Sequence, residues 1–112
     1  MKQIILALVL LLVLDYVTGV AAAFVTKTVS STIGARGIIR KLAILLLISS
    51  TFIAEFYLNF PAITYPAIIF YCINEFISII ENCNRLGIPI PDIVKNALKQ
   101  NTKNALKQNT KK

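Results

Sequence analysis

The chain alternates between long apolar stretches and short polar ones. Three stretches are almost entirely apolar, at residues 4–25, 42–60 and 62–80. A helix needs about 20 mostly apolar residues to cross the hydrocarbon region of a bilayer. Each stretch has roughly that length, so the sequence predicts an all-α membrane protein with three transmembrane helices.

Each apolar stretch also contains one acidic residue. Asp15 lies near the centre of the first stretch, Glu55 toward the end of the second, and Glu75 in the second half of the third. An acidic side chain at mid-membrane costs about 2.5–3.5 kcal/mol on insertion scales, so we interpret such residues as functional by default. With their small and polar neighbours they form the candidate helix-packing or pore-facing set: Asp15, Thr18, Gly19, Ala22, Ala23, Glu55, Asn74 and Glu75.

One face of the first predicted helix is unusually small and polar. Asp15, Gly19 and Ala23 recur at every fourth position, and Thr18 and Ala22 lie on the same broad face. Such a face permits close approach of helices and hydrogen bonds between them. Two interpretations stay open: the face packs against the other helices of the same chain, or it mediates assembly of several copies and then lines water.

The third stretch carries signals for its own start and end. Pro66 has no backbone N–H, which is tolerated only near a helix start, so the regular helix is expected to begin near Tyr65. It is expected to continue to about Leu86, where Gly87 offers a left-handed cap. The following Pro89 and Pro91 prevent continuation.

Composition sharpens this picture. The chain has 112 residues and is 56% hydrophobic, and residues 1–80 hold 53 of its 63 hydrophobic residues.

The N-terminus could also be interpreted as a secretory signal peptide, with Lys2, an apolar run and Ala21-Ala22-Ala23 resembling a cleavage site. Because the apolar character continues to Val25 and is followed by charge, we favour a full membrane span.

The net charge of +7 is distributed very unevenly. Eleven of the twelve basic residues lie between the first two stretches or after the third, and Lys2 is the exception. Basic residues in short loops are retained in the cytoplasm, which predicts an outside N-terminus and a cytoplasmic C-terminus. No nucleic acid is expected as a partner, because the Lys-rich tail lacks aromatic residues. The basic residues expected at the membrane surface are Lys27, Arg36, Arg40, Lys41, Lys95, Lys99, Lys103 and Lys107.

The chain ends in an internal duplication. KNALKQNT occurs at residues 95–102 and again at 103–110, so we divide the chain into a membrane domain, 1–94, and a short basic tail, 95–112. On a helix, successive copies would be rotated by about 80°, so their leucines would not form one stripe. We expect either a weakly helical or disordered tail, or one whose lysines are attracted to anionic lipid headgroups.

The chain lacks the residues of most catalytic and metal sites. It has no His, its acidic residues are far apart in sequence, and Cys72 and Cys83 are the only cysteines. On one helix these two cysteines would lie about 16 Å apart, too far for a disulfide. We therefore expect neither an enzyme nor a metal ion or other cofactor.

Several short motifs, taken together and in order, resemble the holins of Gram-positive phage lysis and toxin secretion. The resemblance covers the chain up to about residue 94. Its motifs are residues 14–19 (LDYVTG), Ser30-Ser31 with Gly34 and Gly37-Ile38 before Lys41, and residues 74–82 (NEFISIIEN) leading to 86–91 (LGIPIP). The duplicated octapeptide lies outside this pattern.

The resemblance implies a multi-pass protein of the bacterial cytoplasmic membrane. Such a protein accumulates, associates with itself and with lipids, and forms lesions that release an endolysin or large proteins such as toxins. An antiholin would be a further partner, and the chain itself could be an antiholin. Two unrelated classes of protein also fit three apolar stretches with acidic residues: a small cation- or proton-coupled transporter and a small membrane toxin. Transporters of this size, however, have four spans.

Overall fold

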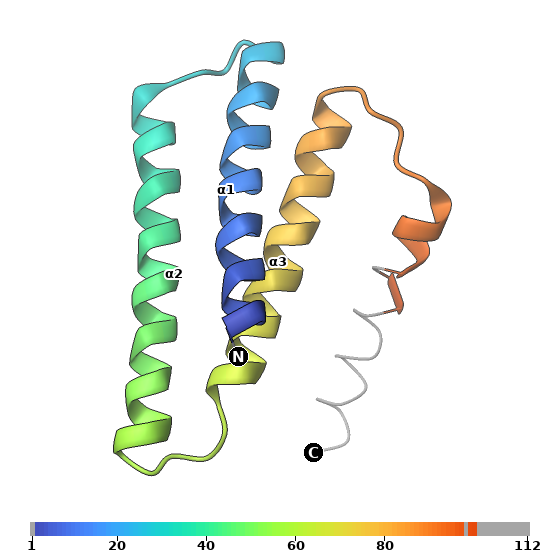
Figure 1. The fold of residues 1–112 in the computed structure, drawn as a ribbon. Coiled ribbons are helices and arrows are strands. Elements are labelled where there is room, and N and C mark those ends of the chain that lie inside the picture. The colour runs from blue at the N-terminus through green and yellow to red at the C-terminus, as the bar shows by residue number, and fades with distance from the viewer. Residues whose placement is uncertain (1, 98, 101–112) are drawn as a thin grey trace.

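The computed structural model describes residues 2–97 and 99–100. It contains three long helices that run side by side in alternating directions: α1 (Lys2–Val25), α2 (Ser31–Tyr57) and α3 (Thr64–Arg85) (Figure 1). Each is long and apolar enough to cross a membrane. The prediction of an all-helical protein with three such helices is confirmed, whereas its orientation stays a prediction.

The third helix follows its sequence signals closely. It begins at Thr64 and ends at Arg85, within a residue of the expected bounds. Gly87 has a φ of 87°, and the Ile88 and Gly87 amides donate to the carbonyls of Cys83 and Asn84, each at 3.0 Å. These two bonds form a Schellman motif, in which glycine accepts the left-handed conformation at little cost.

The second helix differs from its prediction. It spans Ser31–Tyr57 rather than 42–60, so the basic stretch expected as a loop forms its first three turns. Charge ended the predicted apolar span, but charge does not end a helix. Residues such as Ala35, Arg36 and Lys41 are good helix formers, and no proline interrupts them.

Two short links join the helices at opposite ends of the bundle. Residues 26–30 join α1 to α2 at the end where α3 finishes, and residues 58–63 join α2 to α3 at the other end (Figure 1). We call these the 26–30 end and the 58–63 end. Lys27 and Asn59 each adopt a positive φ, of 58° and 60°, which lets the chain reverse within a few residues.

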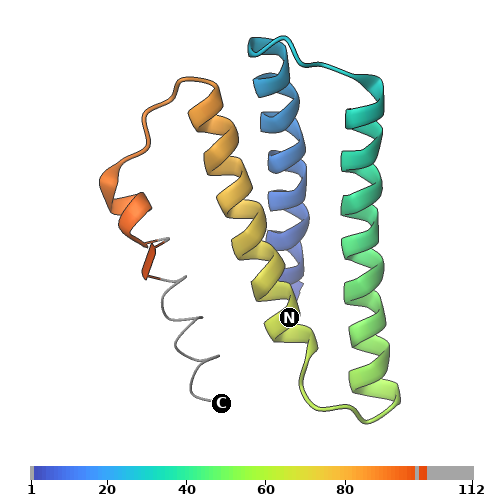
Figure 2. The ribbon, with the colours of Figure 1, turned by 180° about the vertical axis from the view of Figure 1, so that it is seen from behind.

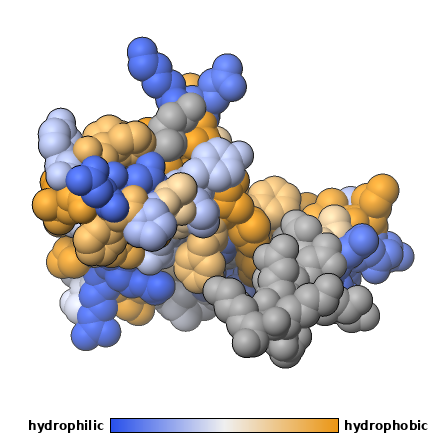
Figure 3. Space-filling view, turned by 90° about the horizontal axis from the view of Figure 1, so that it is seen from below, coloured by the Kyte–Doolittle hydropathy of each residue, from blue (hydrophilic) through white to orange (hydrophobic). Residues whose placement is uncertain are grey.

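The apolar core is small and lies toward the 58–63 end. It consists of Leu8 and Leu12 from α1, Ile48 from α2 and Ile68 from α3. α1 packs more extensively against α3 than against α2 (Figure 2). Most other large apolar side chains lie on the outer surface, and apolar residues cover much of the face seen in Figure 3. Leu46, for example, is 70% exposed. An outer surface of this kind is expected for helices surrounded by lipid.

A short helical segment at 92–97 follows α3 and turns back beside it (Figure 1). Ile93 and Val94 line an apolar cleft of about 440 Å³ together with Ile73 and Phe76 of α3. The described part of the basic tail, residues 95–97 and 99–100, is helical. The second copy of the octapeptide, including Lys103 and Lys107, lies outside the described residues.

Candidate functional site

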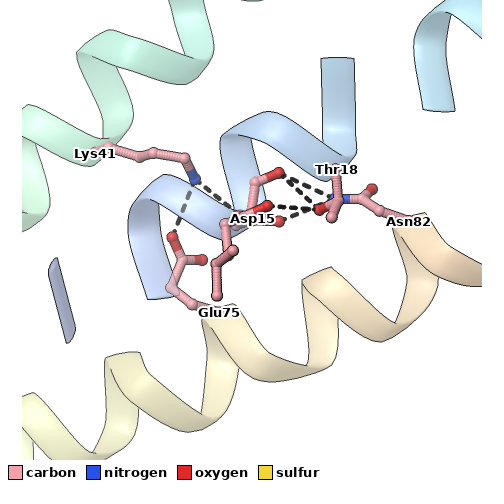
Figure 4. Close-up of polar contacts among 6 residues, drawn as sticks. Asp15, Thr18, Lys41, Glu75 and Asn82 are labelled. Atoms are coloured by element: carbon pink, nitrogen blue, oxygen red, sulfur yellow. Dashed lines mark hydrogen bonds and ion pairs between the residues drawn. The ribbon is translucent and has the colours of Figure 1, made fainter. Parts of the chain in front are cut away.

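Three charged side chains, one from each helix, meet inside the bundle. The Lys41 ammonium of α2 donates to Asp15 Oδ2 of α1 at 2.8 Å and to Glu75 Oε1 of α3 at 3.0 Å (Figure 4). We call these three residues the ion cluster. It links all three helices through one nitrogen atom, although its members are widely separated in sequence.

The helix bounds explain why these residues meet. Asp15, Lys41 and Glu75 each lie ten residues from the helix end nearest the 26–30 end, namely Val25, Ser31 and Arg85. At 1.5 Å per residue, each is about 15 Å into its helix. Three antiparallel helices of similar length therefore bring the three charges to one level.

Asn82 and Thr18 extend the ion cluster toward the 26–30 end. The Asn82 amide donates to Asp15 Oδ1 at 3.0 Å, to the Asp15 carbonyl at 3.2 Å and to the Thr18 hydroxyl at 3.0 Å (Figure 4). A Cβ added at Gly19 would lie 3.4 Å from this amide nitrogen. Glycine at that position thus gives the Asn82 side chain room to reach α1.

The ion cluster is largely buried and unbalanced in charge. Asp15 is 8% exposed and Glu75 4%, and one ammonium faces two carboxylates. Placing charges in a poorly polar environment is costly, and ion pairing with additional hydrogen bonds offsets much of that cost. Loss of Lys41 would leave two carboxylates facing each other without a counter-charge.

Water-sized space adjoins the ion cluster on two sides. A polar cleft of about 260 Å³ between α2 and α3 is lined by the ion cluster together with Arg40, Asn74, Ser78 and Glu81. A second cleft, of about 350 Å³, extends from Asp15 to the 26–30 link. The charged groups are therefore buried in the bundle but next to openings that reach its surface.

The small and polar face predicted on α1 lies against α3 in this structure. Ala22 is fully buried, Gly19 contacts Asn82, and the Thr26 hydroxyl lies 3.4 Å from Arg85 Nη2. Ala23 is half-buried beside Ala22. Within this single chain the face packs against α3, and its role in assembly of several copies stays a prediction.

Glu55 has a different place from the other predicted acids. Its Oε1 accepts hydrogen bonds from the backbone amides of Ile63 at 2.7 Å and Thr64 at 3.0 Å. These amides lie at the start of α3, where the first N–H groups have no partner within the helix. Glu55 on α2 thus caps α3 and holds the two helices together at the 58–63 end.

Most of the predicted surface lysines and arginines that the structure describes are exposed. Those residues are Lys27, Arg36, Arg40, Lys95 and Lys99. Lys41 is a correction: we expected it at the membrane surface, and the structure places its ammonium in the ion cluster. The reason is that two carboxylates on neighbouring helices offer a stronger counter-charge than water or headgroups.

Sequence reasoning missed Asn82 and the packing role of Tyr16. The Tyr16 side chain lies over Gly34 and Gly37 of α2. An added Cβ would lie 3.3 Å from the Tyr16 hydroxyl oxygen at Gly34 and 3.6 Å from the Tyr16 ring at Gly37. The spacing Gly34-x-x-Gly37 on one helix face was the available signal for this contact. Asn82 was noted only as the last residue of the 74–82 motif, because its contact with Asp15 depends on how α1 and α3 pack.

Within the part of the chain that the structure describes, no group of three or more metal-ligating side chains occurs. Cys72 and Cys83 are both free and half-buried. The contacts that the described residues make in the site are charge pairs and hydrogen bonds between helices.

Comparison with known proteins identifies the family. An uncharacterised protein of Clostridium perfringens is 42% identical over 98 residues, covering 86% of this chain and 73% of that protein. A second uncharacterised protein of that organism, of 14.9 kDa and encoded in the nagH 3′ region, is 40% identical over 97 residues, covering 85% and 74%. One from Halalkalibacterium halodurans is 38% identical over 97 residues, covering 81% and 72%.

No solved structure matches the chain. The bacteriophage holin family matches residues 1–103, which include all three helices and the ion cluster. The chain belongs to the bacteriophage holin family.

Proposed function

We propose that this protein is a holin that accumulates in the bacterial cytoplasmic membrane and assembles into lesions large enough to release proteins. The released protein would be an endolysin, or a toxin in a secretion system. Family membership and three helices long enough to cross a membrane support this proposal. We propose the orientation expected from the basic residues, with the C-terminus in the cytoplasm.

The observation that carries the proposal is the ion cluster. In the packed bundle, Lys41 satisfies Asp15 and Glu75, so the charged groups are kept from lipid while the protein accumulates. A lesion needs a hydrophilic wall, and these same side chains supply one once the helices separate and turn them toward water. The same residues thus suit both the packed bundle and the wall of a lesion.

Energetics sets the balance between these two states. Ion pairing inside the bundle offsets only part of the free-energy cost of burying the charges, whereas water solvates each charge fully. While lipid surrounds the bundle, helix separation would expose the charges to hydrocarbon, so the packed bundle is favoured. Assembly of many copies around an aqueous opening removes that preference.

Induced expression in a bacterium that also makes a cytosolic endolysin tests the proposal. We expect a quiet lag followed by an abrupt, endolysin-dependent fall in turbidity and release of a cytosolic enzyme. Gradual ion or drug flux without protein release would identify a transporter instead. Loss of membrane potential without release would indicate a toxin, and delayed lysis by a co-expressed holin would indicate an antiholin.

Variants of the ion cluster and its surroundings link that assay to the structure. Asp15→Leu removes one carboxylate, and Gly19→Ile displaces the Asn82 side chain. Both are expected to change the time of lysis without preventing membrane insertion. Leu46→Ile, on the outer surface, is the matched control and should keep the native timing. Native timing in both test variants would contradict a role for the ion cluster in lysis.

A further inference from the structure

Four polar side chains line the cleft between α2 and α3 and make no hydrogen bond or ion pair with another described residue. They are Arg40 from α2 and Asn74, Ser78 and Glu81 from α3. Arg40, Asn74 and Glu81 are exposed, and Ser78 is half-buried. Ion pairs between described residues involve only Lys41, Asp15 and Glu75, so Arg40 and Glu81 are unpaired within the part of the chain that the structure describes. We call these four residues the cleft set.

The hydrogen bonding of Ser78 differs from that of two serines on α2. The hydroxyls of Ser49 and Ser50 donate to carbonyls four residues earlier in α2, at 2.9 and 3.0 Å. Such bonds are the usual way in which a helix satisfies a serine in lipid. Ser78 makes no such bond to a described residue, so its hydroxyl is available to another partner.

The position of Asn74 in the middle of α3 favours a partner from outside the chain. Asn74 lies ten residues from Thr64 and eleven from Arg85, at the middle of α3. An amide exposed there would face hydrocarbon, where polar groups without hydrogen bonds are costly. Asn and Ser side chains in membrane helices commonly satisfy one another across a helix–helix contact.

The charges of the cleft set are complementary to those of the same surface on another copy. Arg40 and Glu81 have opposite sign and stand on opposite walls of one cleft. A two-fold axis along the membrane normal keeps both chains in the same orientation and places the α2 wall of each cleft opposite the α3 wall of the other. Arg40 and Glu81 lie about 14 Å and about 6 Å from the 26–30 end of their helices, an offset that their long side chains span. We propose that the α2–α3 cleft is the self-association surface of this holin, with Arg40–Glu81 pairs flanking contacts made by Asn74 and Ser78.

This inference rests on the proposed function, because lesions require many copies, but it can be tested without lysis. Full-length chains carrying a donor or an acceptor fluorophore at the C-terminus are placed in lipid vesicles, and energy transfer reports their association. Arg40→Glu and Glu81→Arg each create two like-charge contacts, and each is expected to weaken association about tenfold or more. Lys2→Glu, exposed on α1 at the 58–63 end and outside the cleft, is the matched control and should associate like the native chain.

Mixing the two charge variants gives the decisive result. An Arg40→Glu chain and a Glu81→Arg chain form two opposite-charge pairs with each other, so the mixture should recover association close to the native level. The double variant should recover it too. Recovery in the double variant but not in the mixture would overturn the proposal, because it would show that Arg40 and Glu81 pair within one chain.

Oxidative cross-linking provides a second measurement that does not change these charges. In a chain with Cys72→Ser and Cys83→Ser, the substitution Asn74→Cys is expected to give disulfide-linked dimers. Ser50→Cys, on the part of α2 outside the cleft, should give few. Equal cross-linking at both positions would overturn the assignment of the surface. Loss of association with native lysis would contradict this inference alone, whereas absence of lysis with native association would contradict the proposed function alone.

Discussion

The two halves of the bundle are held together in different ways. Toward the 26–30 end, the ion cluster and Asn82 join the helices through charges and hydrogen bonds. Toward the 58–63 end, Leu8, Ile48 and Ile68 pack as an apolar core. In water the apolar half would dominate stability, but lipid tails are as apolar as leucine. In a membrane, the polar half therefore specifies which helices pair, and the apolar half contributes through fit of shape.

The largest expected effect comes from Lys41→Met. Removing the ammonium leaves two buried carboxylates without a counter-charge, and breaking a buried pair in this way costs about 3–5 kcal/mol. The free energy of unfolding, measured by loss of helicity as SDS is added to mixed micelles, checks this. Arg36→Met is the control, because Arg36 is exposed on the same helix. A similar loss for both variants would remove the distinction between the two halves.

A smaller effect is expected from Leu8→Ala in the apolar half. Leu8 is 1% exposed, so its truncation leaves a cavity. In a bilayer the alternative environment of this side chain is lipid rather than water, so the hydrophobic contribution to its stabilising effect is small. We expect a loss of about 2 kcal/mol, at the low end for buried leucines. Leu10→Ala, on the outer surface, should change stability far less. A loss greater than that of Lys41→Met would show that apolar packing dominates after all.

Glu55→Ala tests the contact of a charged side chain with the start of α3 at the 58–63 end. It removes the acceptor for the Ile63 and Thr64 amides, and losing a helix cap costs about 0.5–2 kcal/mol. Hydrogen exchange of those two amides should accelerate while amides near Asp15 keep their protection. Glu55→Gln retains a neutral acceptor and should fall between. Unchanged exchange in the alanine variant would mean that another group caps α3.

The smallest effect concerns the contact between Tyr16 and α2. Gly34→Ala gains about 1 kcal/mol of helix propensity, but its Cβ meets the Tyr16 hydroxyl at 3.3 Å. We expect the two effects nearly to cancel in the native chain. In a Tyr16→Phe chain the oxygen is absent, and the same substitution should stabilise. Equal effects in both backgrounds would show that Tyr16 does not set the spacing between α1 and α2.

Much of the fold followed from local signals. Pro66 and Gly87 gave the start and end of α3 to within a residue, because a missing N–H and a left-handed φ act locally. The start of α2 was placed eleven residues too late, at 42 instead of Ser31. Apolar character marks where a helix meets lipid, and helix propensity with hydrogen bonding marks where the helix itself ends.

The candidate site was predictable in part. Asp15 and Glu75 stood out because acids inside apolar runs are costly, and both belong to the ion cluster. Lys41 was grouped with the surface lysines because it adjoins Arg40 in the sequence. Equal distances of the three charges from the helix ends are apparent only when the start of α2 is known. Asn82 required, in addition, knowledge of which face of α3 packs on α1.

Three helices long enough to cross a membrane, the acidic residues within them and the family can all be inferred from the amino-acid order. These properties depend on hydrophobic length and local chemistry, which act within one segment. The position of Lys41 between Asp15 and Glu75, and the capping of α3 by Glu55, are known from the folded bundle alone. These contacts join residues 8 to 34 positions apart in the sequence. They depend on the level and rotation of each helix in the bundle. Hydrophobicity does not encode the level or the rotation, because the free energy of an apolar helix in lipid is nearly the same for every rotation about its axis.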